Sequence, residues 1–134
     1  MSSPAISAER LVVVRGKREV LHGVSLQVPA GQVTGLLGPS GSGKTTLLRS
    51  VVGVQRIRSG TVTVLGLPAG SAVLRRRIGY VTQAPSVYGD LTVRENAWYF
   101  AAMYGLGAGP ADAAIRDVGL GDRPDQLAGS LSGG

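Results

Sequence analysis

The chain has 134 residues, of which 43% are hydrophobic, and its 14 basic and 8 acidic residues give a net charge of +6. It contains no cysteine and a single histidine, which excludes disulfide bonds, thiolate metal sites and histidine metal clusters. The basic residues are scattered, and the one run, Arg75-Arg76-Arg77, is too short to indicate binding of nucleic acid.

The first part of the chain has the pattern of β-strands separated by turns. Arg10–Arg15 is rich in β-branched residues and predicts a strand, and Gly16–Arg18 predicts a turn. Glu19–Leu21 is a short return, and Val24–Val28 alternates apolar and polar residues as a half-buried strand does. Pro29-Ala30-Gly31 then predicts another turn. The start of the chain is therefore predicted to be rich in strands.

A glycine-rich segment that follows is the most specific motif of the sequence. It fits the phosphate-loop pattern G-x-x-x-x-G-K-[ST] and consists, with one further threonine, of Gly38, Pro39, Ser40, Gly41, Ser42, Gly43, Lys44, Thr45 and Thr46. The preceding Gln32–Leu37 predicts a strand, and the following Thr46–Gly53 predicts a helix that ends on glycine. This strand–loop–helix context favours a phosphate-binding loop over a chance glycine-rich turn.

The residue types of this loop suit a nucleoside triphosphate. Glycines let successive backbone N–H groups point at phosphate oxygens, and the helix that follows directs the positive end of its dipole at the same anion. The motif places Lys44 on the β- and γ-phosphates and the Thr45 hydroxyl on Mg²⁺. Thr46 is a candidate for the α-phosphate. We therefore expect ATP and Mg²⁺ as cofactors.

The middle of the chain supplies one further candidate residue. Thr61–Gly66 alternates like a strand, Ala72–Arg77 predicts a short helix, and Ile78–Gln83 predicts a buried strand that ends on a polar side chain. Ligand-facing residues of parallel sheets lie at the carboxyl ends of strands. On spacing alone, Gln83 is equally consistent with a ligand of Mg²⁺-bound water or γ-phosphate and with a strand end that has no such role.

The last third of the chain changes from strands to helices. Thr92 and Glu95 form the pattern of a capping box at the start of a helix over Val93–Tyr104. A second helix is predicted over Ala111–Val118, with Gly119 at its end. Beyond it, a serine followed by two glycines (Ser132, Gly133 and Gly134) is the pattern of another anion-binding nest, although this short pattern is weak by itself.

In order and spacing, these features resemble the nucleotide-binding subunit of ATP-binding-cassette (ABC) transporters. The resemblance runs from about Leu11 to the last residue. The segments that carry it are Val20–Leu26, which is similar to the strand before the phosphate loop, Gly38–Thr45 as Walker A, Ile78–Gln83 as the Q-loop, Leu91–Asn96 as the start of the helical subdomain, and Leu131–Gly134 as the start of the LSGGQ signature. Ala97–Leu106 looks most like bacterial drug or polysaccharide exporters of the ABC-2 type.

The resemblance implies a composite site shared by two ATP-binding subunits, in a homodimer or a heterodimer. Lys44, Thr45 and Thr46 would act within the subunit, with Gln83 as the catalytic sensor of Mg²⁺ and γ-phosphate. Ser132, Gly133 and Gly134 would act on the partner's nucleotide. The other implied partner is an integral membrane permease, which places the protein on the cytoplasmic side of the plasma membrane. Nucleic acid is not an expected partner.

Two departures from the family pattern affect these expectations. Family members commonly carry an adenine-stacking aromatic residue just before the first-strand glycine, where this chain has Arg15 before Gly16. The chain also ends inside the signature, before the Walker B aspartate, the catalytic glutamate, the D-loop and the switch histidine. We therefore expect the 134 residues alone to bind nucleotide without turnover.

The expected fold class is α/β. The resemblance implies a P-loop NTPase with a RecA-like core, an N-terminal antiparallel β subdomain and an α-helical subdomain, incomplete at the C-terminus. Residues 1–134 would form a partial ABC domain, with the β subdomain and Walker A core over about 10–83 and the helical subdomain over about 84–134. One alternative is a soluble ABC-type ATPase of translation or DNA repair. The DNA-repair type usually inserts long coiled coils between Walker A and signature, and no heptads occur between Thr45 and Leu131. The other alternative is a small P-loop kinase.

Overall fold

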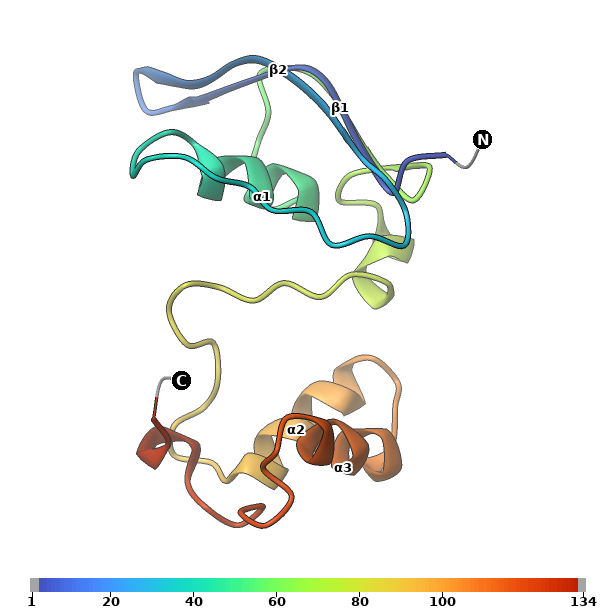
Figure 1. Cartoon of the computed structure of the whole chain (residues 1–134), viewed down its shortest axis with the longest axis vertical. Helices are drawn as coiled ribbons and strands as arrows, with labels where there is room; N and C mark the ends of the chain where they lie inside the picture. Colours follow the sequence, from blue (N-terminus) through green and yellow to red (C-terminus); the bar gives the residue numbers. More distant parts are fainter. Residues whose placement is uncertain (1–2, 133–134) are drawn as a thin grey trace. The chain divides into compact units, whose positions relative to one another are not determined.

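The computed structural model describes residues 3–132 (Figure 1), and the chain divides into two compact units between Tyr80 and Val81. The first unit contains the strands and the helix that follows the glycine-rich loop, and the second contains the remaining α-helices. No helix among residues 3–132 is long and apolar enough to cross a membrane.

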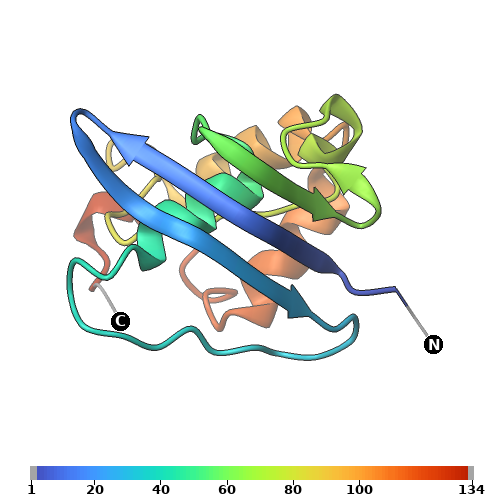
Figure 2. The same ribbon diagram turned by 90° about the horizontal axis from the view of Figure 1, so that it is seen from above.

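The first unit is built on a four-stranded antiparallel sheet in the order β2-β1-β3-β4 (Figure 2). The strands are β1 (Ile6–Arg15), β2 (Arg18–Val28), β3 (Ser59–Val64) and β4 (Leu67–Pro68). The predicted strands at 10–15 and 61–66 are confirmed, although β1 begins four residues earlier and β3 two residues earlier than expected. The two short segments predicted at 19–21 and 24–28 form one continuous strand, because both pair with β1.

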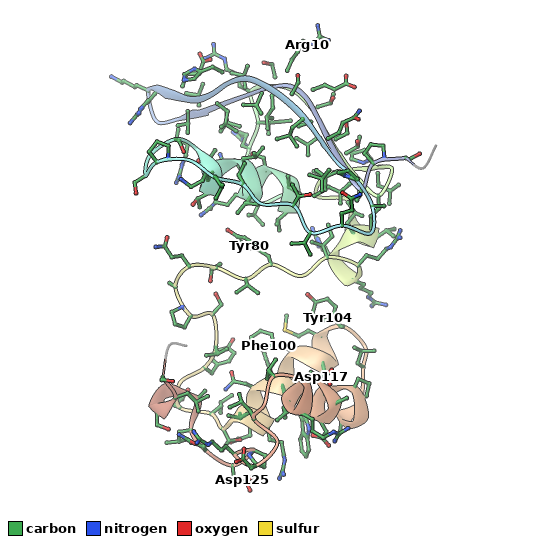
Figure 3. The ribbon with its side chains drawn as sticks, in the orientation of Figure 1. Arg10, Tyr80, Phe100, Tyr104, Asp117 and Asp125 are labelled. Carbon is green, nitrogen blue, oxygen red and sulfur yellow. The ribbon has the colours of Figure 1, made fainter. Side chains whose placement is uncertain are left out.

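Strand β1 bends at Arg10, where its register with both neighbouring strands shifts. Arg10 has a positive φ of 48°, and its backbone N–H donates a hydrogen bond of 2.9 Å to Ser25 Oγ on β2. Its side chain lies on the face of the sheet away from helix α1 (Lys44–Val52) (Figure 3). The bulge thus lets the strand curve while the apolar side chains before and after it keep facing the core.

The core of this unit lies between the sheet and α1. Leu11 and Val13 of β1 are fully buried there together with Leu74 of a short 3₁₀-helix, η1 (Ala72–Arg76), and Leu47 of α1 is buried in the same cluster. This confirms the short helix predicted at 72–77. Helix α1 confirms the helix predicted after the loop, and its C-cap is Gly53 in the left-handed conformation, as expected from the sequence.

Two strand predictions are wrong for this structure. Residues 33–37 and 78–83 are irregular and belong to no sheet. The side chains of Val33, Leu37 and Val81 are almost fully exposed. Apolar composition favours a strand, but a strand forms only where a neighbouring strand accepts and donates its backbone hydrogen bonds. No described segment pairs with either run. Gln83 therefore does not end a strand here.

The second unit is helical. Helix α2 (Val93–Met103) begins with the predicted capping box: the Glu95 N–H donates to Thr92 Oγ1 and the Thr92 N–H donates to Glu95 Oε1, both at 3.1 Å. Helix α3 (Ala108–Asp117) packs against α2 and begins three residues before the predicted start. A second 3₁₀-helix, η2 (Ala128–Ser130), follows. The segment before it joins α2 through an isolated bridge between Thr92 and Leu127.

Buried Asn96 fixes the chain that leads into α2. Its Oδ1 accepts a hydrogen bond from the Tyr88 N–H at 2.9 Å, and its Nδ2 donates to the Tyr88 carbonyl at 2.9 Å and the Thr92 carbonyl at 3.0 Å. The Tyr88 ring meets Tyr99 edge-on at 5.3 Å between centroids. The Tyr99 phenol raises the pKa of Tyr88 through a side-chain hydrogen bond and its charge, with a smaller contribution from burial.

Candidate phosphate-binding site

The glycine-rich loop enters α1 through two glycines with positive φ, Gly41 at 80° and Gly43 at 97°. Gly43 is the N-cap of α1, and a Cβ at this position would lie 2.8 Å from Leu21 Cδ2 and 3.4 Å from the Val20 carbonyl oxygen. The loop therefore packs directly on β2, and only glycine satisfies both the backbone conformation and the contact. Residues 38–46 thus enter the helix in a defined geometry.

The first turn of α1 presents positive charge without an acidic partner. No side chain caps the helix N-terminus, and its first turn has no acidic residue. The N-terminal N–H groups of a helix and its dipole together attract anions. Glu9 and Glu19 are the only carboxylates in residues 1–80, and Glu19 Oε1 contacts His22 Nδ1 at 3.1 Å. A polyanion can therefore approach this turn without meeting a resident carboxylate.

Lys44 directs its ammonium group into the loop. Nζ donates to the carbonyl oxygens of Gly38 at 2.5 Å and Pro39 at 2.7 Å, and to Ser42 Oγ at 3.3 Å. All three acceptors are neutral, so the positive charge has no counter-ion among the described residues. Phosphate oxygens are stronger acceptors than carbonyl groups for an ammonium ion. The lysine is therefore held where an anion over the loop would meet it.

The two threonines after Lys44 differ in exposure. Thr45 is exposed in the first turn of α1, whereas Thr46 is 4% exposed and belongs to the buried face of the helix. The Thr46 carbonyl accepts a hydrogen bond of 2.8 Å from Ser50 Oγ. The exposed hydroxyl of Thr45 is accessible to a hydrated cation on a bound phosphate. The buried position of Thr46 indicates that this residue also contributes to the packing of α1.

The remaining predicted site residues lie in the second unit. Gln83 is exposed in the irregular segment after Tyr80, and Ser132 is exposed at the end of the described chain. Gly133 and Gly134 lie outside the described residues. The structure thus brings together the loop residues of the first unit, and a role for Gln83, Ser132, Gly133 and Gly134 stays a prediction. In residues 3–132 no three His, Cys, Asp or Glu side chains gather as a metal site.

Sequence reasoning missed the support of the loop by β2. Leu21 and Val20 contact Gly43 across 22 and 23 positions of sequence. No local pattern indicates such a contact, because both residues look like ordinary alternating strand residues. The signal that could have suggested it is the glycine at position 43, directly before the helix, because a glycine can also mark a close approach of another segment to the backbone.

These features define the class of P-loop nucleotide-binding proteins: a glycine-rich loop, a helix without an N-terminal side-chain cap, a lysine directed into the loop and a sheet against which the loop packs. The comparisons with known proteins then specify the family. The profile described as ABC transporter matches residues 21–134, and the chain belongs to this family. In agreement with the expected fold class, the chain is an α/β P-loop chain with an antiparallel sheet and a helical unit.

Similar curated proteins are named as ATP-binding proteins of export or of resistance to a compound. The chain is 38% identical over 125 residues to the Nod factor export ATP-binding protein I of Burkholderia lata, a match that covers 89% of this chain and 41% of that protein. It is 34% identical over 135 residues to the linearmycin resistance ATP-binding protein LnrL of Bacillus subtilis, covering 96% and 43%. The chain thus spans less than half the length of the curated relatives it matches.

Solved structures agree with this assignment. An ATP-binding subunit of an ABC transporter superposes with a TM-score of 0.81 at 25% identity, covering 96% of this chain and 56% of that chain. A bacterial Atm1-family ABC exporter with ATP bound superposes with a TM-score of 0.83 at 27% identity, covering 98% and 25%.

Proposed function

We propose that the chain is part of the ATP-binding component of an ABC exporter and that residues 38–46 hold the phosphates of ATP. The observation that carries the proposal is the Lys44 ammonium, which is directed into a loop of neutral acceptors beside an uncapped helix N-terminus. The export relatives named above support transport as the purpose of ATP binding. They also support export as its direction, because both are named for export of, or resistance to, a compound.

The described residues fit ATP with Mg²⁺ in three ways. The helix N-terminus supplies N–H groups, Lys44 supplies a positive charge, and the exposed Thr45 hydroxyl supplies an oxygen for the cation. Bound Mg²⁺ would neutralise negative charge on the phosphates. Gln83 is our candidate for a second cation contact and for sensing the γ-phosphate.

We further propose that hydrolysis requires groups from outside the first unit. Its two carboxylates lie on strands, Glu9 on β1 and Glu19 on β2, and the second contacts His22. No other acidic group of residues 1–80 can act as the base that orients an attacking water. The first unit by itself is therefore expected to bind ATP without turning it over.

We propose the assembly that the family resemblance implies. A second ATP-binding subunit would receive Ser132, Gly133 and Gly134 on its nucleotide, and a membrane permease would hold both subunits at the cytoplasmic face of the membrane. We propose residues 1–80 as the β subdomain with the phosphate loop and residues 81–134 as the helical subdomain. This division is close to the one expected from the sequence, at about residue 83.

Substitution of Lys44 tests the proposal. Lys44→Ala removes the ammonium group and should weaken Mg-ATP binding at least ~30-fold, since a charge-assisted hydrogen bond in such a site contributes about 2 kcal/mol or more. Arg56→Ala is the matched control, because it removes the same charge from an exposed side chain beyond the opposite end of α1. Isothermal titration calorimetry on folded protein gives both affinities. Equal ATP affinity of Lys44→Ala and Arg56→Ala would contradict the proposed site.

A further inference from the structure

The segment that leads to Ser132 lies along the start of α2. The first N–H groups of an α-helix have no partner within the helix itself. In α2, the Val93 N–H donates a hydrogen bond of 2.9 Å to the Gln126 carbonyl. The Arg94 N–H donates to the Pro124 carbonyl, also at 2.9 Å. The segment therefore caps α2 through its backbone, and the start of the helix fixes where the segment lies.

A second set of backbone contacts holds η2, the 3₁₀-helix near the end of this segment. The Ala128 N–H donates to the Leu91 carbonyl at 2.9 Å. The Gly129 N–H donates to the Gly89 carbonyl at 3.0 Å. Within the turn, the Leu131 N–H donates to the Ala128 carbonyl at 3.2 Å. The first two N–H groups of η2 thus anchor the turn that carries the candidate signature serine to the chain before α2.

The closest approach in this anchorage joins Gly89 and Gly129, and it is asymmetric. A Cβ at Gly129 would lie 2.9 Å from the Gly89 carbonyl oxygen and 3.3 Å from the Gly89 Cα. A Cβ at Gly89 would meet the Gly129 Cα at 3.4 Å, which is an ordinary van der Waals distance. Neither glycine has a positive φ, so the contact alone decides what each position tolerates. An alanine at 129 must move the turn, because backbone atoms obstruct it, whereas an alanine at 89 need not.

Packing against the helices does not fix the turn by itself. Ala128, Leu131 and Ser132 line a cavity of about 440 Å³, and its other walls include apolar side chains of α2 and α3. Because space remains on this side of the turn, the side chains leave it room to move. The backbone contact with Gly89 therefore sets the place of the turn, and with it the place of Ser132.

We propose that Gly129 is a positioning residue: its close contact with Gly89 holds Ser132 where the nucleotide of a second copy of the chain can meet it. The inference rests on the proposed role of Ser132, Gly133 and Gly134 toward a partner's nucleotide, and it adds the residue that sets where this segment lies. Gly129 acts only through the turn. An alanine at this position should therefore impair the association of two copies and spare ATP binding by the phosphate loop, which belongs to the first unit.

Analytical ultracentrifugation of the 134-residue chain, with and without Mg-ATP, tests the proposal. Each copy carries both a phosphate loop and Ser132, so the wild-type chain should associate more tightly when Mg-ATP is bound. Gly129→Ala should weaken this ATP-dependent association at least ~10-fold, as expected for loss of a hydrogen bond to a charged group. Its affinity for Mg-ATP, measured calorimetrically on the monomer, should stay within about twofold of wild type.

Three further variants separate position from stability. Gly89→Ala adds a methyl group on the other side of the same contact and should leave the association within about twofold. Ala111→Gly weakens α3 at a buried residue away from the contact, and it should also leave the association within about twofold. Ala128→Pro removes the donor to the Leu91 carbonyl, and it should weaken the association as Gly129→Ala does. This last variant replaces Gly129→Ala if circular dichroism shows that the latter does not fold.

The outcomes distinguish the inference from the proposed function. Unchanged ATP-dependent association in folded Gly129→Ala or Ala128→Pro overturns the positioning role, and so does an equal loss in Gly89→Ala or Ala111→Gly. In these cases Lys44-dependent ATP binding still supports the proposed function. A wild-type chain that binds ATP but shows no ATP-dependent association contradicts the role of Ser132 toward a partner and the inference with it. Absence of ATP binding by the folded wild-type chain contradicts the proposed function itself.

Discussion

Replacement of Gly43 by alanine tests how the phosphate loop is held against the sheet. Two unfavourable effects coincide at this residue. Its φ of 97° lies in the left-handed region, where an alanine costs about 1 kcal/mol or more. The new Cβ would also lie 2.8 Å from Leu21 Cδ2, and Leu21 is only 4% exposed and cannot turn away into solvent. Overpacking of this kind costs about 1–3 kcal/mol. Gly43→Ala should therefore lower the free energy of unfolding by about 2–4 kcal/mol.

Gly41 provides the control that separates the two effects. It also has a positive φ, 80°, but a Cβ there meets nothing within 4 Å. Gly41→Ala should cost about 1 kcal/mol, which is the conformational contribution alone. Urea unfolding followed by circular dichroism measures both variants. In a Leu21→Ala background the contact is gone, and the excess cost of Gly43→Ala should disappear. Equal costs for the two glycines in the wild-type background, or an excess that survives Leu21→Ala, would refute the proposed packing of the loop on β2.

Two further predictions concern stability and turnover. Asn96→Ala leaves the Tyr88 N–H and carbonyl without their Asn96 partners and should lower the unfolding free energy of the second unit by about 2–3 kcal/mol. Hydrogen exchange at the Tyr88 amide should become faster, and unchanged exchange would contradict this prediction. The purified chain should release phosphate from Mg-ATP at the background rate, because Glu9 and Glu19 are the only carboxylates of its first unit. Release of phosphate above background that depends on Lys44 would contradict this prediction, because it would show that the chain contains a group able to act as the base.

Local chemistry made part of the fold predictable. The capping box at Thr92 and Glu95 and the glycine that ends α1 are set by interactions within one or two helical turns, and both appear as expected. The helix after the glycine-rich loop was predictable for the same reason, because the loop and the helix are contiguous in sequence.

Pairing between distant segments was not predictable in the same way. The run at 33–37 has the composition of a strand, but strand formation depends on a neighbour, and no described segment pairs with it. The continuous length of β2 and the contact of Leu21 with Gly43 likewise depend on β1 and on the loop, not on local sequence. Gln83 shows the consequence for the site: its expected place at a strand end depended on a strand that does not form here.

Mapping of nucleotide contacts by NMR tests the central claim most directly. Amide chemical shifts of the ¹⁵N-labelled chain are recorded while Mg-ATP is added, with Mg²⁺ alone as the reference. The loop amides of Gly41, Gly43, Lys44 and Thr45 should show the largest changes, and the changes should saturate at one equivalent of bound nucleotide. Saturating changes confined to residues outside 38–46, with the loop amides unmoved, would contradict the assignment of this loop as the ATP site.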